Sequence, residues 1–448
     1  MSAVQSNTYG KLNRRQLLRL AGVGAASIAL AACVAPAPAV APAASGGGGA
    51  APSEEAVTLT IFDFGGEADQ KVYSEAHARF NETHSNVTIV DNFTPVSTWS
   101  EYSNKIVTQV AGGQSPDIIN IAIEGAKLLV SKGLLIPLDE TMAGDPDSSE
   151  LLDDVHPELI APFIIEGKTW LIPHSWNNMV IYYNTKIFAE AGLEPPKADW
   201  TWNDFLEIAT TLTTGSGDDK VFGFAIPNFN FGLHGWWLTN DTYQLNDEWT
   251  ESNLDDPKMT EAVQFVHDLV HKHGVSPSVE GTDNGNLFVS GRVAMGGWGH
   301  WPIQGFYAND FQDFDVQLWP QNRVQKTVFG VGGWGISPQT PHAELSWELI
   351  RELTSKQTIQ ATADVGVAIP ARRSVAESDA FLEKPGNAKI FYASLDNTRP
   401  VASPANFNEL ETIFMRHMGE VMSDAVTPEA GMAAAHEELS AAMARLQS

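Results

Sequence analysis

The feature that most constrains the fold is an alternation of apolar runs and amphipathic segments that begins at Val57. In the first amphipathic segment Val72, Ala76 and Phe80 fall on one face at helical spacing. Strand and helix in alternation favour an α/β lobe with a largely parallel sheet. The first expected strands cover residues 57–64, 87–93 and 117–123, and the helices cover 67–84, 98–113 and about 124–132.

The remainder of the chain continues the same pattern. Thr201 and Asp204 resemble a shortened capping box at a helix start. Residues 167–193 predict a hairpin-like strand pair followed by a short helix, 221–227 a strand, 259–274 and 343–355 helices, and the tail from about 407 is mainly helical. Because no Gly/Pro/Ser-rich linker follows residue 56, a second lobe would be reached through ordered strands.

The first 33 residues read as an export signal. Lys11, Arg14, Arg15 and Arg19 precede an apolar run from 20 to 32 that is too short to span a bilayer comfortably. The paired arginines resemble a twin-arginine signal, although a general secretory route remains open. Leu30-Ala31-Ala32-Cys33 resembles a bacterial lipobox, which predicts lipidation at Cys33; the alternative is an ordinary cleavage site.

Residues 34–56 read as a flexible tether, because the Pro/Ala/Gly-rich segment has no apolar periodicity to pack. A lipid on Cys33 would hold the folded part at the outer face of the cell membrane, extracellular or periplasmic. No other stretch is long and apolar enough to predict a membrane span.

Composition excludes several function classes. The 448-residue chain carries a formal net charge of −28, which disfavours binding to nucleic acid or to an anionic membrane surface. A single cysteine excludes a cysteine-cluster metal site. We find no H-E-x-x-H, P-loop, G-x-S-x-G or EF-hand pattern, and we predict no metal and no cofactor.

One pattern suggests a nucleotide-binding site. Gly330, Gly332 and Gly335 form G-x-G-x-x-G within "GVGGWG", which is typical of a pyrophosphate loop between a strand and a helix N-terminus. Here Pro338 and Pro341 precede the next helix. The glycines therefore predict a strand-like segment rather than a dinucleotide site.

Tryptophan beside glycine is the pattern that favours a ligand site. The chain has 13 Trp, and several, such as Trp298, Trp301 and Trp334, are flanked by Gly. A ring whose neighbours lack side chains is free to face a cavity, where it can stack on the C–H faces of a sugar. The alternative is that these rings fill the core.

Several segments resemble the family 1 extracellular solute-binding proteins of ABC importers, the group that includes maltose-binding protein. The likeness covers about residues 57–448. Order and spacing carry it more than any single segment. The matching segments are "SPDI" (115–118), "GKTWLIPHSWNNMVIYYN" (167–184), "IFAEAGLEPPKADWTWNDFLEIATTL" (187–212), "LFVSGRVAMGGWGHW" (287–301), "GVGGWGIS" (330–337) and "GVAIPARRSV" (366–375).

The resemblance implies an α/β, two-lobed, type II periplasmic-binding-protein-like fold. The ligand would lie in a cleft between lobes joined by a hinge of crossing strands, and the lobes would close on it. Residues 57–175 plus about 334–366 would form lobe 1, and 176–333 plus about 367–448 would form lobe 2.

By match of position, the resemblance also implies the residues that line the cleft. Trp298 matches the family's aromatic platform most directly, and the family's spacing favours Arg372 over Arg373. The implied ligand-binding residues are Gly66, Glu67, Glu124, Trp176, Asn177, Asn228, Trp236, Trp298, Trp301, Trp334 and Arg372.

These observations predict a non-enzymatic, monomeric binding protein that delivers a carbohydrate, an oligosaccharide by expectation, to the permease subunits of an ABC importer. One alternative is a different solute: glycerol phosphate, or a polyamine held by carboxylates such as Glu67, Glu124 and Asp241. The other is an exported carbohydrate-active enzyme, which would place two cleft carboxylates about 5–10 Å apart.

Overall fold

The computed structural model describes residues 55–94, 96, 98–366 and 368–447. The predicted signal segment, Cys33 and the tether as far as residue 54 lie outside the described residues. Within the described part, no helix combines the length and the apolarity needed to cross a membrane.

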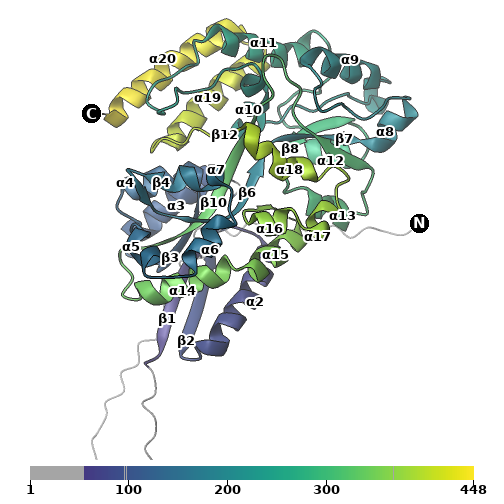
Figure 1. Ribbon diagram of the computed structural model, residues 1–448. Coiled ribbons are helices and arrows are strands. Elements are labelled where there is room, and N and C mark those ends of the chain that lie inside the picture. The colour runs from purple at the N-terminus through teal and green to yellow at the C-terminus, as the bar shows by residue number, and fades with distance from the viewer. Residues whose placement is uncertain (1–54, 95, 97, 367, 448) are drawn as a thin grey trace, which may run out of the picture. The chain divides into compact units, whose positions relative to one another are not determined.

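The described residues contain a seven-stranded mixed sheet, in the order β11-β6-β10-β3-β1-β2 with β12 also paired to β10 (Figure 1). β1 runs parallel to β2 and β3, whereas β10 runs antiparallel to both β3 and β6. The expected "largely parallel" sheet is therefore half right, because β10 returns late in the chain against the first strands. The strands are β1 (Val57–Asp63), β2 (Val87–Phe93), β3 (Ile118–Ala122), β6 (Ile172–Asn178), β10 (Thr327–Ile336), β11 (Ile369–Pro370) and β12 (Thr398–Pro400).

A second sheet, three-stranded within the described residues, is antiparallel in the order β8-β7-β9. Its strands are β8 (Met295–Trp298), β7 (Val180–Asn184) and β9 (Phe314–Gln317). The predicted pairing of two strands within 167–193 is wrong for β6 and β7. The chain leaves the first sheet after β6 and enters the second at β7, with only Met179 between them. A short hairpin does occur just before, between β4 (Ile164–Ile165) and β5 (Lys168–Thr169).

Helices cover both sheets. α14 and α15 pack against α2, and α3 packs against α4, beside the seven-stranded sheet. α20 packs against α19 and α11, as the yellow end of the chain shows (Figure 1). The longer helices are α2 (Glu67–Thr83), α3 (Trp99–Ala111), α4 (Ile123–Ser131), α9 (Trp202–Leu212), α10 (Asn230–Thr239), α11 (Pro257–His271), α14 (Ala343–Leu353), α15 (Lys356–Val365), α19 (Phe407–Met422) and α20 (Pro428–Gln447).

Short helices fill the connections. They are α5 (Asp139–Ala143), α6 (Ser148–Asp153), α7 (Pro157–Ile160), α8 (Thr185–Glu190), α12 (Asn284–Val289), α13 (Ile303–Ala308), α16 (Arg373–Ala376), α17 (Asp379–Leu382) and α18 (Lys389–Ala393). The predicted capping box is confirmed: the Thr201 side chain accepts a hydrogen bond from the Asp204 N–H, and the Asp204 side chain accepts one from the Thr201 N–H.

The strand expected at 221–227 is not formed. Val221, Phe222 and Ala225 make only isolated bridges. Gly223 lies so close to α9 that a Cβ would stand 2.0 Å from the Ala209 carbonyl oxygen. The segment touches β8 only through the bridge between Ala225 and Gly296.

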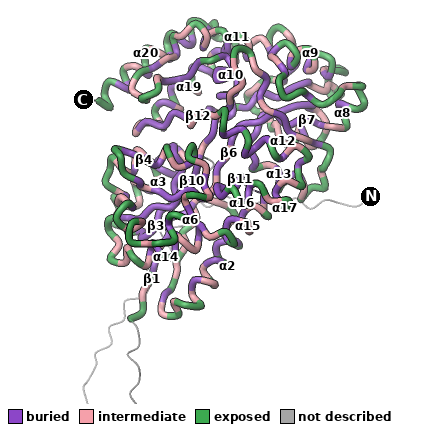
Figure 2. The backbone as a smooth tube through the Cα atoms, in the orientation of Figure 1, coloured by how far each residue is buried: buried purple, intermediate pink, exposed green. Residues whose placement is uncertain are grey.

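The core follows the central strands, which are almost wholly buried (Figure 2). β10 is buried along nearly its whole length, and its glycines explain how. Cβ atoms on Gly333 and Gly335 would stand 2.7 Å from the Phe163 ring and 2.9 Å from the Leu135 side chain. These two glycines therefore serve close packing, as the strand-like interpretation of "GVGGWG" expects.

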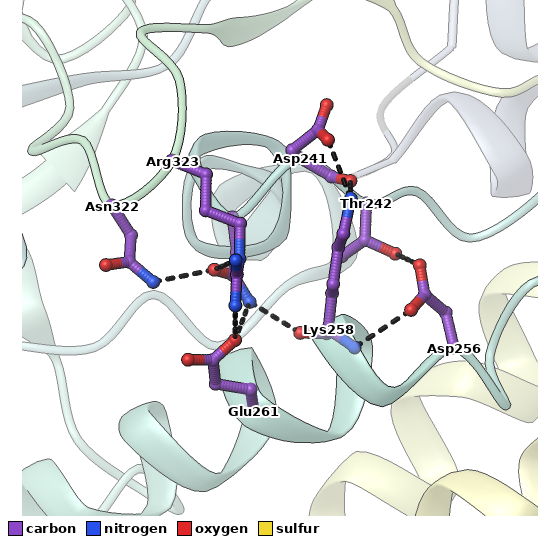
Figure 3. Close-up of polar contacts among 8 residues, drawn as sticks. Asp241, Thr242, Asp256, Lys258, Glu261, Asn322 and Arg323 are labelled. Atoms are coloured by element: carbon purple, nitrogen blue, oxygen red, sulfur yellow. Dashed lines mark hydrogen bonds and ion pairs between the residues drawn. The ribbon is translucent and has the colours of Figure 1, made fainter.

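A polar cluster fixes the C-terminal end of α10 against α11 (Figure 3). The Lys258 ammonium pairs with Asp241 at 2.7 Å, and the Thr242 hydroxyl donates to Asp256 at 2.8 Å. Arg323 pairs with Glu261 at 2.8 Å. These links anchor the helix whose other end carries Phe231.

Candidate functional site

Glu124 is the side chain around which a candidate site can be built. It is the second residue of α4 and follows β3 directly. Only 9% of the residue is exposed, and its Oε2 is buried without a hydrogen-bond partner among the described residues. Buried carboxylate oxygens are normally paired, so the free oxygen is an acceptor available to a ligand.

Gly330 forms the floor beside that carboxyl group. A Cβ on Gly330 would stand 3.4 Å from Oε1 of Glu124 and 3.5 Å from Cε2 of Phe231. Because Gly330 has no side chain, the space between the carboxyl group and the aromatic ring stays open. Asn177 lies directly across the ladder from Gly330.

The carboxyl group has an unusual proton affinity. The pKa of Glu124 is raised to about 7, mainly by burial and in part by the negative charge of Glu411. Glu411 comes from α19 and accepts a hydrogen bond from the Ser100 hydroxyl on α3. Burial raises the pKa of Glu411 as well. Two carboxyl groups from distant parts of the chain therefore share one poorly hydrated environment.

Aromatic side chains line the site from two directions. Phe231 lies 6.5 Å from Trp301, and Phe229 lies 6.0 Å from the same ring, measured between ring centroids. Trp301 is 37% exposed. The Asn177 side-chain oxygen accepts a hydrogen bond of 2.8 Å from the His300 N–H, which holds the segment carrying Trp301 against β6. We call Glu124, Asn177, Phe231, Trp301 and Gly330 the Glu124 site.

A second group of aromatic side chains includes Trp99 and Tyr102 on α3, the helix that packs against α4. Phe64 lies 4.1 Å from Trp99 and 5.7 Å from Tyr102. The Tyr102 hydroxyl is buried without a partner in the described part of the chain. Asp63 fixes this group, because its carboxylate accepts hydrogen bonds from the Phe64 N–H at 2.7 Å and from Asn120 at 2.6 Å.

Four of the tryptophans expected to line the cleft are buried in the core instead. Trp236 packs among Trp202, Phe205, Phe224 and Trp319, and Trp298 packs against Tyr182 and Phe288. Trp334 lies against Tyr73 and His174, and the Trp176 N–H donates to the Pro370 carbonyl. For Trp298 the packing has a local reason, because a nearby glycine leaves room for the ring to fold back. A Cβ on Gly296 would stand 2.2 Å from the Trp298 ring.

Arg372 also has a structural role in this conformation. Its guanidinium is buried, donates to the Thr354 carbonyl at 2.9 Å and pairs with Asp154 at 3.2 Å. It joins α6 to the end of α14. Another cation, Lys127 on α4, has its ammonium nitrogen 4.3 Å from the centroid of the Trp249 ring.

The remaining predicted residues are exposed. Gly66 and Glu67 lie at the start of α2, where the Gly66 N–H donates to Asp69 at 2.9 Å. Asn228 lies just before α10 and lines a small cavity described below. Asp241 is held in the ion pair with Lys258. The carboxylates proposed for a polyamine, Glu67, Glu124 and Asp241, are thus in three different settings.

Other features do not add chemistry. Among the described residues no three His, Cys, Asp or Glu side chains are arranged to hold a metal ion. A surface cavity of about 1080 Å³ lies between α2, α6 and α14. Arg79, Arg351 and Arg372 line it, and each is paired with a carboxylate.

Sequence reasoning missed Trp99, Tyr102 and Glu411 and named Phe64 and Phe231 only within longer segments. Trp99 and Tyr102 have a weak local signal: "TWSEY" places both rings in the first turns of a helix capped by Thr98. Glu411 has none, because it reaches the site only through the packing of α19 on α3 and α4. The assembled site offers aromatic faces, an unpaired acceptor and an open floor, which suit a polyhydroxylated ligand.

Comparison with known proteins identifies the family. The model of the bacterial extracellular solute-binding proteins matches residues 75–389. The chain is similar to the maltotriose-binding protein of Pyrococcus abyssi, with 21% identity over 59% of this chain and 57% of that protein. It is also similar to an sn-glycerol-3-phosphate-binding periplasmic protein of Rhizobium meliloti, with 23% identity over 51% of this chain and 54% of that one. The chain spans about half the length of the curated relatives it matches.

The fold is shared with a solved structure, an ABC substrate-binding protein of Listeria monocytogenes in complex with cycloalternan. The TM-score is 0.78 at 23% identity, and the match covers 87% of this chain and 100% of that one. This confirms the predicted two-lobed, periplasmic-binding-protein-like fold. Since the family model spans residues 75–389, the chain belongs to the bacterial extracellular solute-binding proteins.

Proposed function

We propose that this protein is the substrate-binding component of an ABC importer, and that it binds a saccharide at the Glu124 site and delivers it to the permease. The observation that carries this proposal is the free Oε2 of Glu124 beside an aromatic ring and an open glycine floor. The Glu124 carboxyl group would accept a hydrogen bond from a sugar hydroxyl, while Phe231 and Trp301 would lie against the C–H faces of the sugar ring. Binding without catalysis is part of the proposal.

The division into lobes is also a proposal. Residues 57–175 with about 334–366 would form one lobe, and 176–333 with about 367–448 the other. The passage from β6 into β7, which belong to different sheets, supports a hinge at Met179. The Ser100–Glu411 hydrogen bond and the stacking of Lys127 on Trp249 would then be contacts that change when the lobes open.

Charge argues against a phosphate ligand. Glu124 and Glu411 would repel it, whereas a saccharide meets only hydrogen-bond acceptors. A polyamine would gain from both carboxylates and from the aromatic rings. It therefore belongs in the same experiment as the saccharides.

The test is isothermal titration calorimetry of the purified full-length protein with maltotriose, arabinotriose, glycerol 3-phosphate and spermidine. We expect a saccharide to bind and the other two to give no heat. Binding of spermidine or glycerol 3-phosphate alone would refute the saccharide proposal. Release of shorter sugars during prolonged incubation, followed by chromatography, would refute binding without catalysis.

The Gly330→Val substitution tests whether the saccharide binds beside Glu124. The added methyl groups would project between Glu124 and Phe231, so we expect loss of detectable saccharide binding with a retained thermal transition. Gly305→Val is the matched control, because Gly305 is exposed on α13 and a Cβ there meets open space. If Gly330→Val bound saccharide normally, the ligand would have to lie elsewhere.

We further propose that the protein is exported and held at the membrane by a lipid on Cys33, as a monomer. Cys33→Ser should move the protein from the membrane fraction to the soluble fraction, and mass spectrometry should show loss of the acyl groups. Replacing Arg14 and Arg15 by Lys would distinguish the twin-arginine route from the general secretory route, since only the former should be blocked.

A further inference from the structure

A small apolar cavity lies on α19, outside the Glu124 site. Its volume is about 160 Å³. The side of the cavity formed by α19 and Leu233 is methionine and aliphatic, and the polar members of the lining are Asn228, Ser278, Glu280 and Ser423. Apolar lining residues are Ile226, Leu233, Met415, Met418 and Met422.

Gly419, an exposed residue of α19, forms part of the cavity lining. It sits inside α19, where glycine costs about 1 kcal/mol relative to alanine. Outside the helix's own backbone, a Cβ at this position would meet open space rather than a packed neighbour. The missing side chain instead leaves volume in the cavity wall.

Two elements connect the cavity with the Glu124 site. On α19, Met415 follows Glu411 by four residues, so the two side chains lie on one face about 6 Å apart along the axis. In the segment before α10, Pro227 and Asn228 line the cavity, and the next residue, Phe229, contacts Trp301. The cavity and the Glu124 site are therefore built on the same two elements, α19 and the segment that leads into α10.

The size and chemistry indicate what would fill it. A cavity of about 150 Å³ lined by apolar side chains accepts a molecule the size of benzene. Methionine side chains adapt to irregular apolar groups and make favourable contacts with aromatic rings. We propose that the cavity is a subsite for a small apolar substituent, such as an aryl or short alkyl aglycone, attached to the saccharide in the Glu124 site.

This inference rests on the proposed saccharide function, so its test has one arm that needs no sugar. Fluorobenzene is titrated into the full-length protein and followed by ¹⁹F NMR. We expect a saturable shift that is lost in Gly419→Leu, whose side chain would fill the cavity. Gly305→Leu is the control, because that glycine also faces open space but lies on α13, outside the cavity lining. Leucine favours helix more than glycine does, so both variants should fold.

The second arm compares maltotriose and arabinotriose with their phenyl glycosides by calorimetry. We expect a phenyl glycoside to bind at least tenfold more tightly than its parent sugar, about 1.4 kcal/mol. Gly419→Leu should remove this gain while changing the dissociation constant of the parent sugar less than twofold.

The outcomes separate the two ideas. Fluorobenzene binding that is lost in Gly419→Leu, without any sugar binding, would support the cavity and refute the saccharide function. Sugar binding with no phenyl gain, or a gain that survives Gly419→Leu, would overturn the subsite.

Discussion

Replacing Glu124 by glutamine should make the protein more stable at alkaline pH and leave it unchanged at acidic pH. The side chain is buried, its Oε2 has no partner in the described chain, and burial raises the pKa from an ordinary 4.5 to about 7. Protonated glutamic acid and glutamine have nearly the same shape. The variant therefore isolates the cost of the charge.

The sign of the effect follows from proton binding. Between pH 4.5 and 7 the folded protein holds a proton on Glu124 that the unfolded chain has released, so the free energy of unfolding falls as the pH rises through this window. Each pKa unit corresponds to about 1.4 kcal/mol, and the full shift gives roughly 3 kcal/mol. Because this shift already includes the repulsion from Glu411, we expect a difference of about 3 kcal/mol between variant and parent at pH 8, and about zero near pH 4.5.

Urea unfolding of the full-length protein at several pH values measures this difference directly. Other buried carboxyl groups, such as Asp63 and Asp91, cancel because they are present in both proteins. Glu75→Gln is the control, since Glu75 is exposed on α2. A difference between Glu124→Gln and parent that stays constant from pH 5 to pH 8 would refute the buried, charge-strained carboxyl group.

Three further substitutions separate ligand contacts from packing. Trp301→Ala should weaken saccharide binding by about 2 kcal/mol in calorimetry, with little change in urea unfolding because the ring is partly exposed. Trp334→Ala should cost about 3–5 kcal/mol of unfolding free energy, because the ring is buried against Tyr73 and His174, while the folded protein keeps its affinity. Arg372→Leu should lower the free energy of unfolding in urea by about 3 kcal/mol, because Asp154 and the Thr354 carbonyl lose their buried partner. If unfolding were unchanged and saccharide binding were lost, Arg372 would be a ligand contact.

Helices and strands could be predicted from the sequence where apolar residues recur at regular spacing. The helix at 67–83, with Val72, Ala76 and Phe80 buried, and the strand at 87–93 match their predicted bounds within a residue or two. The pairing of strands was not readable. β6 and β7 look like a hairpin because they are adjacent and apolar, yet each is buried between partners from far along the chain.

The site was harder to predict for the same reason. Glu124 could be named from the sequence, because the resemblance implies that the end of the third strand lines the cleft. Glu411 could not, because nothing in "NFNELETIF" distinguishes it from a solvated helix residue until α19 meets α3. Trp301 and Trp298 lie in the same glycine-rich segment, and only packing separates them: Tyr182 and Phe288 cover Trp298, whereas Trp301 remains partly exposed.

Glycine has opposite meanings within "GVGGWG", and this explains why the pattern misleads. At Gly333 and Gly335 a Cβ would collide with neighbours, so glycine permits close packing. At Gly330 a Cβ would fit, at 3.4 Å from Glu124, so glycine is not required by the fold and leaves room for something else. Gly419 on α19 repeats this second case. A glycine whose Cβ would meet open or nearly open space costs backbone entropy without helping to pack the core. Gly305 shows that such a glycine can also lie on an exposed helix surface. Gly330 differs because the space left by its missing side chain lies between Glu124 and Phe231, which is where we propose that the ligand binds.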